Sequence, residues 1–143
     1  KIGFKKIVLP IDNTPQSRQK VSYALAVARS YGSHICIAGL INFGNEDNKR
    51  MFKLKVDQVE EWLLQHGVSV EKKFVEGDNL AKMTMQAAEE WDADLIVIMT
   101  EQEPSITGFF LGTYATQVVN HSKIPVMAVH PSESDGSTIT VGY

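Results

Sequence analysis

The chain has little cysteine, no long apolar run and no excess of one charge. Its single cysteine, Cys36, excludes a disulfide within the chain. No apolar run approaches the roughly 18 to 20 residues of a membrane-spanning helix, and the first dozen residues lack the long apolar region of a signal peptide. The 14 basic and 17 acidic residues are interspersed, so no basic surface for nucleic acid is indicated. We expect a cytoplasmic protein without nucleic-acid or membrane partners.

The length of the chain fits one domain. Its 143 residues, 43% of them hydrophobic, are enough for one core and too few for two ordinary domains. We expect residues 1–131 to form that domain. Residues 132–143 are rich in serine, threonine and glycine, which predicts a tail that is either flexible or extends across a dimer partner.

Apolar runs and helical periodicities alternate along the chain. Short apolar runs predict strands, and apolar residues spaced by three or four predict helices between them. The helices are expected between Thr14 and Gly32, between the linker 42–48 and Gly67, at about 79–91, and at 112–122. The strands are expected at residues 5–12, 34–41, 68–76, 94–99 and 125–130. This alternation predicts an α/β three-layer sandwich with a five-stranded parallel sheet and four helices.

The composition of the strands predicts their order. The first and fourth strands are continuous apolar runs, as central strands must be, whereas the third carries Glu71, Lys72 and Lys73, as an exposed edge does. The order 3-2-1-4-5 satisfies these constraints. The fifth strand, residues 125–130, is uncharged, which makes it the candidate surface for a homodimer.

This order puts a topological switch point between strands one and four. Ligands of open α/β sheets bind there, outside the carboxyl ends of the strands. Asp12 follows the first strand, and the stretch "MTEQEPSITGFFLGT", residues 99–113, follows the fourth. We therefore expect any binding site to include these two segments.

The sequence resembles the universal stress proteins over almost its whole length. The supporting segments are "KKIVLPID", "DADLIVIM" and "GFFLGTYATQVVNHSKIPVMAVHP", the last of which is similar to the family signature that includes Gly112, Thr113 and Ser122. The resemblance implies a fold like that of the adenine nucleotide alpha hydrolases. It also implies a role in stress response.

The family's nucleotide loop is degenerate in this chain. Members that bind ATP carry glycine at three positions, which fall here on Met99, Gln102 and Gly112, followed by Thr113; only the last glycine is kept. Side chains hinder the close approach of backbone to phosphate, and Glu101 and Glu103 add charge of the same sign as the phosphates.

Parts of a nucleotide site remain. The resemblance implies that Asp12 lies beside the ribose and that Leu40 lines the adenine pocket. The helix start at Gly112 and Thr113 can still attract an anion. These four residues are our candidate cofactor site.

We expect a non-enzymatic homodimer that acts through interactions and does not bind ATP in the family's usual way. The alternative is an ATP- or ADP-binding regulatory switch, with Mg²⁺ and little or slow hydrolysis. A further alternative is that the chain is one half of a tandem protein whose second half binds the nucleotide.

The remaining reactive side chains favour structural roles. Asp12, Glu101 and Glu103 are a candidate divalent-cation set, but they fit no fixed metal motif, and solvated loop acids are the simpler interpretation. Cys36 is expected to be a small buried hydrophobe. The four histidines show no nucleophile or metal pattern, and Trp62 and Trp91 are expected in the core because they follow helical apolar spacing.

Overall fold

The computed structural model describes residues 3–100, 112–130 and 141–142. Strands and helices alternate through this part of the chain, as predicted. The strands are β1 (Lys6–Ile11), β2 (His34–Ile41), β3 (Ser69–Glu76), β4 (Leu95–Met99), β5 (Val126–Val129) and β6 (Val141–Gly142). The helices are α1 (Val21–Tyr31), α2 (Glu46–Gln65), α3 (Leu80–Trp91) and α4 (Thr113–His121), with a 3-10 turn at Pro15–Arg18 before α1. Within these ranges no helix has the length and apolar character needed to cross a membrane.

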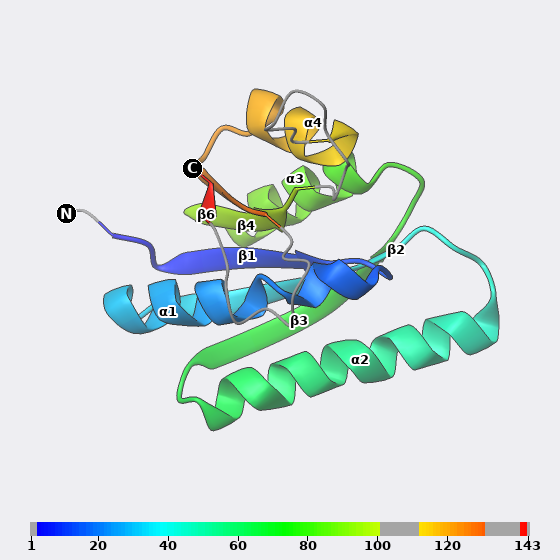
Figure 1. The fold of residues 1–143 in the computed structure, drawn as a ribbon, viewed down its shortest axis with the longest axis horizontal. Helices are drawn as coiled ribbons and strands as arrows, with labels where there is room; N and C mark the ends of the chain where they lie inside the picture. The colour runs from blue at the N-terminus through cyan, green and yellow to red at the C-terminus, as the bar shows by residue number, and fades with distance from the viewer. Residues whose placement is uncertain (1–2, 101–111, 131–140, 143) are drawn as a thin grey trace.

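The six strands form one sheet in the order β3-β2-β1-β4-β5-β6 (Figure 1). The first five are parallel, which confirms the predicted order 3-2-1-4-5. β6 belongs to the tail that was expected to be flexible or to extend across a dimer partner; it pairs antiparallel with β5 of its own chain, opposite Ala128 and Val129. Residues 131–140 and 143 lie outside the described residues, and the domain boundary at 131 stays a prediction.

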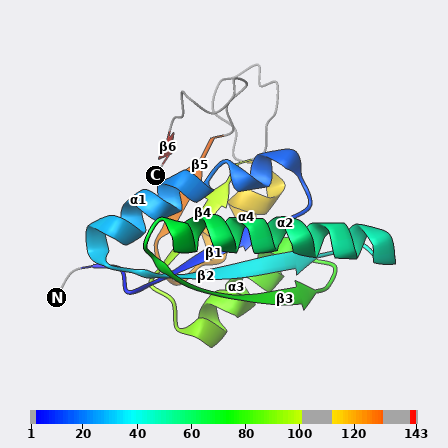
Figure 2. The ribbon, with the colours of Figure 1, turned by 90° about the horizontal axis from the view of Figure 1, so that it is seen from below.

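Helices cover both faces of the sheet, as the predicted sandwich requires. Figure 2 shows α1 and α2 above the sheet and α3 below it. Side chains of α1 and α2 form one core with one face of the strands, and side chains of α3 and α4 form a second core with the other face. The central strands β1 and β4 are buried on both faces except for Lys6 at the start of β1. Their continuous apolar sequence follows from this position.

Local signals explain where the helices begin and end. The side chain of Asn45 accepts a hydrogen bond from the Asn48 amide at the start of α2, and Asn79 does the same for Lys82 at the start of α3. Gly32 ends α1 with a φ of 66°, a left-handed conformation that suits glycine.

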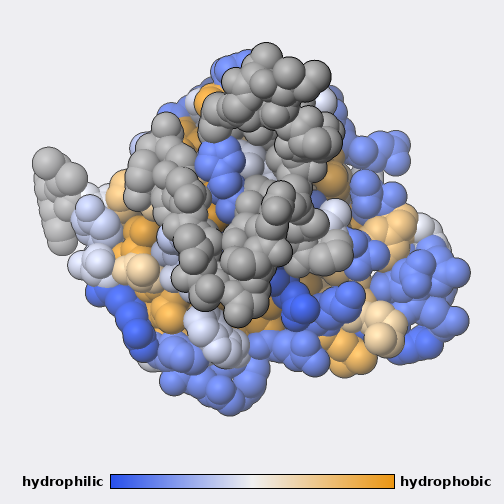
Figure 3. Space-filling view, viewed as in Figure 1, coloured by the Kyte–Doolittle hydropathy of each residue, from blue (hydrophilic) through white to orange (hydrophobic). Residues whose placement is uncertain are grey.

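β3 lies at one edge of the sheet, as its charged side chains predicted. The Lys72 ammonium lies 2.6 Å from Glu60 and 3.4 Å from Asp57, both on α2. On the other face, Lys73 lies 2.5 Å from Glu90 on α3. Figure 3 shows one face of the molecule, on which hydrophilic residues alternate with several hydrophobic areas.

The structure separates the two tryptophans. Trp91 is 9% exposed and lies in the core, as predicted. The prediction for Trp62 is wrong, because its side chain is 37% exposed and its ring packs on His66 with centroids 4.1 Å apart. The buried stripe of α2 runs through Leu63, one residue on, and adjacent helical residues point about 100° apart.

Replacing Gly39 of β2 with alanine should destabilise the fold. A Cβ at this position would lie 2.6 Å from Cδ1 of Phe74, whose ring packs against Phe52. Such overpacking typically lowers the free energy of unfolding by about 1 to 3 kcal/mol, which urea denaturation measures. Gly44→Ala is the matched control, since no atom lies within 4 Å of its added Cβ. Equal stability of the two variants would contradict the close approach of Phe74.

Candidate functional site

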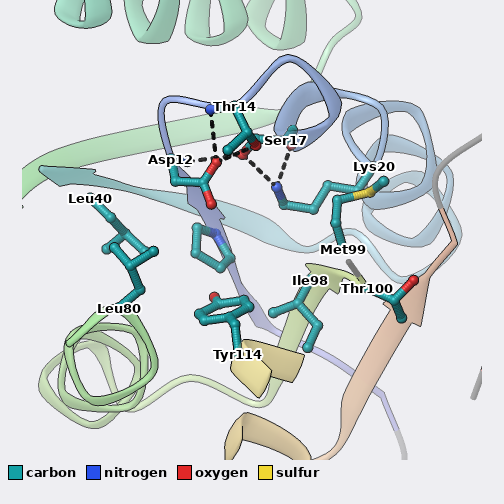
Figure 4. A pocket seen from close by; sticks show the side chains of 11 residues that line it. Asp12, Thr14, Ser17, Lys20, Leu40, Leu80, Ile98, Met99, Thr100 and Tyr114 are labelled. Carbon is teal, nitrogen blue, oxygen red and sulfur yellow. Dashed lines mark hydrogen bonds between the residues drawn. The ribbon is translucent and has the colours of Figure 1, made fainter. Parts of the chain in front are cut away.

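A cavity lies at the topological switch point. β1 and β4 are neighbours in the sheet. After β1 the chain passes to α1 on one face, and after β4 it passes to α4 on the other, so a gap is left at the carboxyl ends of the two strands. The cavity has a volume of about 360 Å³ (Figure 4). Its walls include Asp12, Ser17, Lys20, Leu40, Met99 and Tyr114.

Asp12 is held at the end of β1 by the turn that follows it. One carboxylate oxygen, Oδ1, accepts hydrogen bonds from the Thr14 amide at 3.1 Å and the Thr14 hydroxyl at 2.6 Å. The Asp12 amide donates to the Ser17 hydroxyl at 2.9 Å. The other oxygen, Oδ2, accepts no hydrogen bond from the described residues. It is therefore the atom that a ligand hydroxyl can use.

Lys20 contributes a buried positive charge to the cavity wall. The residue is 2% exposed, and its ammonium donates hydrogen bonds to the carbonyl and hydroxyl oxygens of Ser17. It forms no salt bridge with any carboxylate in the described part of the chain. Figure 4 shows the ammonium beside Ser17, on the same side of the cavity as Asp12.

Burial lowers the pKa of Lys20 from 10.5 to about 8, and the charge of Asp12 opposes this shift. The side chain is therefore still protonated at neutral pH. An ammonium in this position has lost its water without gaining a carboxylate. A ligand anion in the cavity would offset that loss.

Tyr114 closes the cavity from the side of α4. Its hydroxyl lies 2.8 Å from the Thr84 hydroxyl on α3. Burial raises the pKa of the Tyr114 hydroxyl far above its usual range, while the hydrogen bond with Thr84 lowers it and the charge of Asp12 raises it further. The phenol is thus a neutral hydrogen-bonding group and not a base.

The structure brings together two of the four predicted site residues. Asp12 and Leu40 both line the cavity. Gly112 and Thr113 do not, although they begin α4 next to Tyr114, which does. Gly112 has a φ of 91°, so the glycine kept from the family pattern occupies a conformation that suits it.

The degenerate loop is only partly within the described residues. Met99, at the first glycine position of the family pattern, lines the cavity with its side chain. Glu101, Gln102 and Glu103 lie outside the described residues. The proposed cation set of Asp12 with the two glutamates therefore stays a prediction.

Sequence reasoning missed Lys20. The signal is present, because Lys20 stands four residues before Ala24 and so continues the buried face of α1. A lysine on the buried face of a helix either extends its aliphatic chain until the ammonium reaches solvent, or keeps the ammonium inside at a cavity. Only the fold shows that this face begins at a cavity.

Replacing Lys20 with methionine should stabilise the protein at neutral pH and alter its response to alkaline pH. The Lys20 pKa is about 8 in the folded state and 10.5 in the unfolded chain, so the unfolded state binds more protons between these values. As the pH rises from about 7 to 10, the free energy of unfolding of the wild type should therefore increase by about 2 to 3 kcal/mol, because the cost of burying a charged Lys20 disappears. Urea denaturation at several pH values measures this gain.

Lys20→Met removes the gain, so its stability advantage over the wild type should shrink as the pH rises. Lys55→Met, which removes an exposed lysine, is the control and should follow the wild type. An advantage that does not change with pH would contradict a lowered Lys20 pKa.

Comparisons with known proteins agree with this architecture. The chain is 24% identical over 144 residues to universal stress protein MJ0531 of Methanocaldococcus jannaschii, a match that covers 88% of this chain and 82% of that protein. It is similar to a universal stress protein solved in complex with cAMP, with a TM-score of 0.74, 23% identity and coverage of 92% of this chain and 100% of the other.

A universal stress protein of Archaeoglobus fulgidus, solved in complex with dAMP, has a TM-score of 0.69 at 17% identity, covering 89% of this chain and 98% of the other. At these identities the structural matches establish the fold. The family model of the universal stress proteins matches residues 3–130, nearly the whole chain. The switch-point fold and this match together show that the chain belongs to the universal stress protein family.

Proposed function

We propose that this stress protein acts through interactions, without catalysis, and that its switch-point cavity binds an adenine nucleotide with one phosphate. It does not take ATP in the way of the family's glycine loop. The observation that carries this proposal is the Lys20 ammonium, buried at the cavity wall without a salt bridge among the described residues.

The charge of Lys20 favours an anionic ligand. A phosphate group accepts charge-assisted hydrogen bonds, which are stronger than neutral ones. The ammonium has three N–H groups, and Ser17 accepts from it with two oxygens. The third N–H is available to a phosphate.

The rest of the cavity suits a nucleoside. Leu40, Leu80 and Ile98 supply an apolar wall for a base, and Asp12 Oδ2 can accept from a ribose hydroxyl. The two relatives described above were solved with cAMP and dAMP, which each carry a single phosphate. Their fold supports the same class of ligand here.

Size and shape disfavour a triphosphate. A volume of about 360 Å³ lies near the lower end of the range for small-molecule pockets, roughly 300 to 1,000 Å³. Met99 stands where the family pattern has glycine, so a side chain occupies space that a phosphate chain would need. ATP with Mg²⁺ remains the alternative ligand. In that case the protein would be a regulatory switch that hydrolyses ATP slowly.

Calorimetric titration of nucleotide-stripped protein with AMP, adenosine and ATP with Mg²⁺ tests the proposal. We expect AMP to bind at least about tenfold more tightly than ATP. Lys20→Met should weaken AMP binding by about 10- to 100-fold, as the loss of a charge-assisted hydrogen bond does, and should leave adenosine binding nearly unchanged. Lys55→Met is the control for a general effect of charge.

Two results would overturn the proposal. Tighter binding of ATP than of AMP would support the ATP switch instead. No binding of any of the three at millimolar concentration, by a folded protein, would leave the cavity without a nucleotide function.

A variant of the loop after β4 tests whether this loop or the rest of the cavity limits ATP binding. Glycine at Met99 and Gln102, with Glu101 and Glu103 changed to glutamine, should raise ATP affinity if the rest of the cavity is competent. Unchanged ATP affinity in a variant that still binds AMP would show that the loop is not what limits the ligand to one phosphate.

We also infer that the protein is a cytoplasmic homodimer that pairs through the strand at residues 125–130. In the described part of the chain, β6 covers the outer edge of β5 only at Ala128 and Val129. The edge at Val126 and Met127 carries no charge to prevent pairing with a second copy. Light scattering should give a mass twice the 15.9 kDa of the chain. A monomer at micromolar concentration would contradict this interface.

A further inference from the structure

Three metal-ligating side chains of different kinds meet at the end of the sheet opposite the cavity. His34 and Cys36 point to the same face of β2, because alternate strand residues do. Glu71 stands directly opposite Cys36 on β3. The imidazole, thiol and carboxylate ligand atoms all lie within 4.8 Å of one another. We propose that His34, Cys36 and Glu71 bind a zinc ion.

The imidazole of His34 is oriented as a metal ligand is. Its Nδ1 lies 2.8 Å from the Ser69 hydroxyl, and its Nε2 lies 2.9 Å from Glu71 Oε1. Without a metal, Nε2–H donates to the Glu71 carboxylate, which can only accept. With zinc bound, the ring proton would lie on Nδ1 and be donated to the Ser69 hydroxyl, so that Nε2 presents its lone pair to the ion. Zinc-binding histidines are commonly held in this way by a second hydrogen bond.

The carboxylate of Glu71 is oriented from the other side. The Trp91 indole N–H donates to Glu71 Oε2 at 2.7 Å, which leaves Oε1 directed at His34. The Glu71 side chain is 53% exposed and that of His34 is 28% exposed. An ion can therefore reach Oε1 and Nε2 from solvent, and Cys36 lies beneath them.

Small movements would complete the coordination. Bond lengths of about 2.0 to 2.3 Å at tetrahedral angles put zinc ligand atoms roughly 3.3 to 3.6 Å apart. The N–O pair at 2.9 Å has to open slightly, and the most distant pair has to close by about 1 Å. The side chains of Glu71 and His34 are 53% and 28% exposed, so both can rotate to make these changes. Water would take the fourth position.

The donor set favours zinc over other common cations. Mg²⁺ and Ca²⁺ prefer oxygen ligands only, whereas nitrogen, sulfur and oxygen together suit Zn²⁺. Thiolate and carboxylate balance the two charges of the ion, and the Cys36 proton leaves on binding. The nearby ammonium groups of Lys6 and Lys73 already have partners, the Trp91 carbonyl and Glu90.

This site is independent of the proposed nucleotide cavity. Cys36 and Leu40 are four residues apart on β2, which separates them by about 13 Å at the strand rise. Lys20 and Asp12 are at the same end as Leu40. Loss of zinc binding and loss of nucleotide binding can therefore be measured separately.

Titration of metal-free protein with Co²⁺ tests the proposal. Cobalt substitutes for zinc, and a cobalt–thiolate bond adds a charge-transfer band to the visible bands of a four-coordinate ion. Cys36 is the only cysteine of the chain, so such a band reports on this residue alone. We expect one cobalt per chain, a thiolate band, and loss of both signals when Zn²⁺ is added.

Variants identify the other two ligands. His34→Gln and Glu71→Gln should each weaken zinc binding by at least about tenfold, and Cys36→Ser should abolish the charge-transfer band. His66→Gln is the matched control, because it removes a histidine outside the cluster. In a Trp62→Phe background, Trp91 is the only tryptophan, so its fluorescence should change as zinc binds.

A folded wild-type protein that shows no thiolate band with excess cobalt would overturn the proposal. A band that persists unchanged in both His34→Gln and Glu71→Gln would overturn the ligand set. Binding of Cu⁺ without binding of Co²⁺ or Zn²⁺ would overturn the assignment of the metal.

Discussion

Everything else in this protein depends on the burial of β1 and β4 on both faces. A parallel pair in this position needs crossovers, and the crossover helices have to cover opposite faces of the sheet. The chain therefore diverges between these strands, and a gap opens at their carboxyl ends. Asp12 and Lys20 come together there because they follow the same strand and bound the same turn. The candidate site thus follows from the placement of the helices after β1 and β4 on opposite faces of the sheet.

The cavity lacks two glycines of the family pattern and contains a buried lysine. The glycines that allow close approach to a phosphate chain are replaced at Met99 and Gln102. The cavity wall contains a buried ammonium, that of Lys20, which is held by Ser17 and has no salt bridge among the described residues. Backbone amides suit a chain of phosphates, whereas a single ammonium suits one. This difference is the physical argument for the proposed ligand with a single phosphate.

The opposite end of the sheet is organised by the charged side chains of an edge strand. There β3 is an edge strand, and its charged side chains are tied to α2 and α3 by ion pairs. Glu71 belongs to the same edge but contacts His34 and Trp91 instead. These contacts orient a carboxylate and an imidazole above the only thiol of the chain. The edge that charge protects from pairing thus also carries a ligand of the proposed zinc site, Glu71.

The sequence by itself determined the element types, the strand order and two residues of the cavity. Apolar runs distinguish central strands from edge strands. A residue near the carboxyl end of a strand can be placed at the switch point once the strand order is known, as Asp12 and Leu40 were. Lys20, the exposure of Trp62, the pairing of β6 and the cluster of His34 with Glu71 were decided by the tertiary structure. The cluster and the β6 pairing depend on the register between strands, which local patterns do not carry. The periodicity of α1 and α2 contains a signal for Lys20 and Trp62, but only the fold shows that Lys20 lies at a cavity and how far Trp62 is exposed.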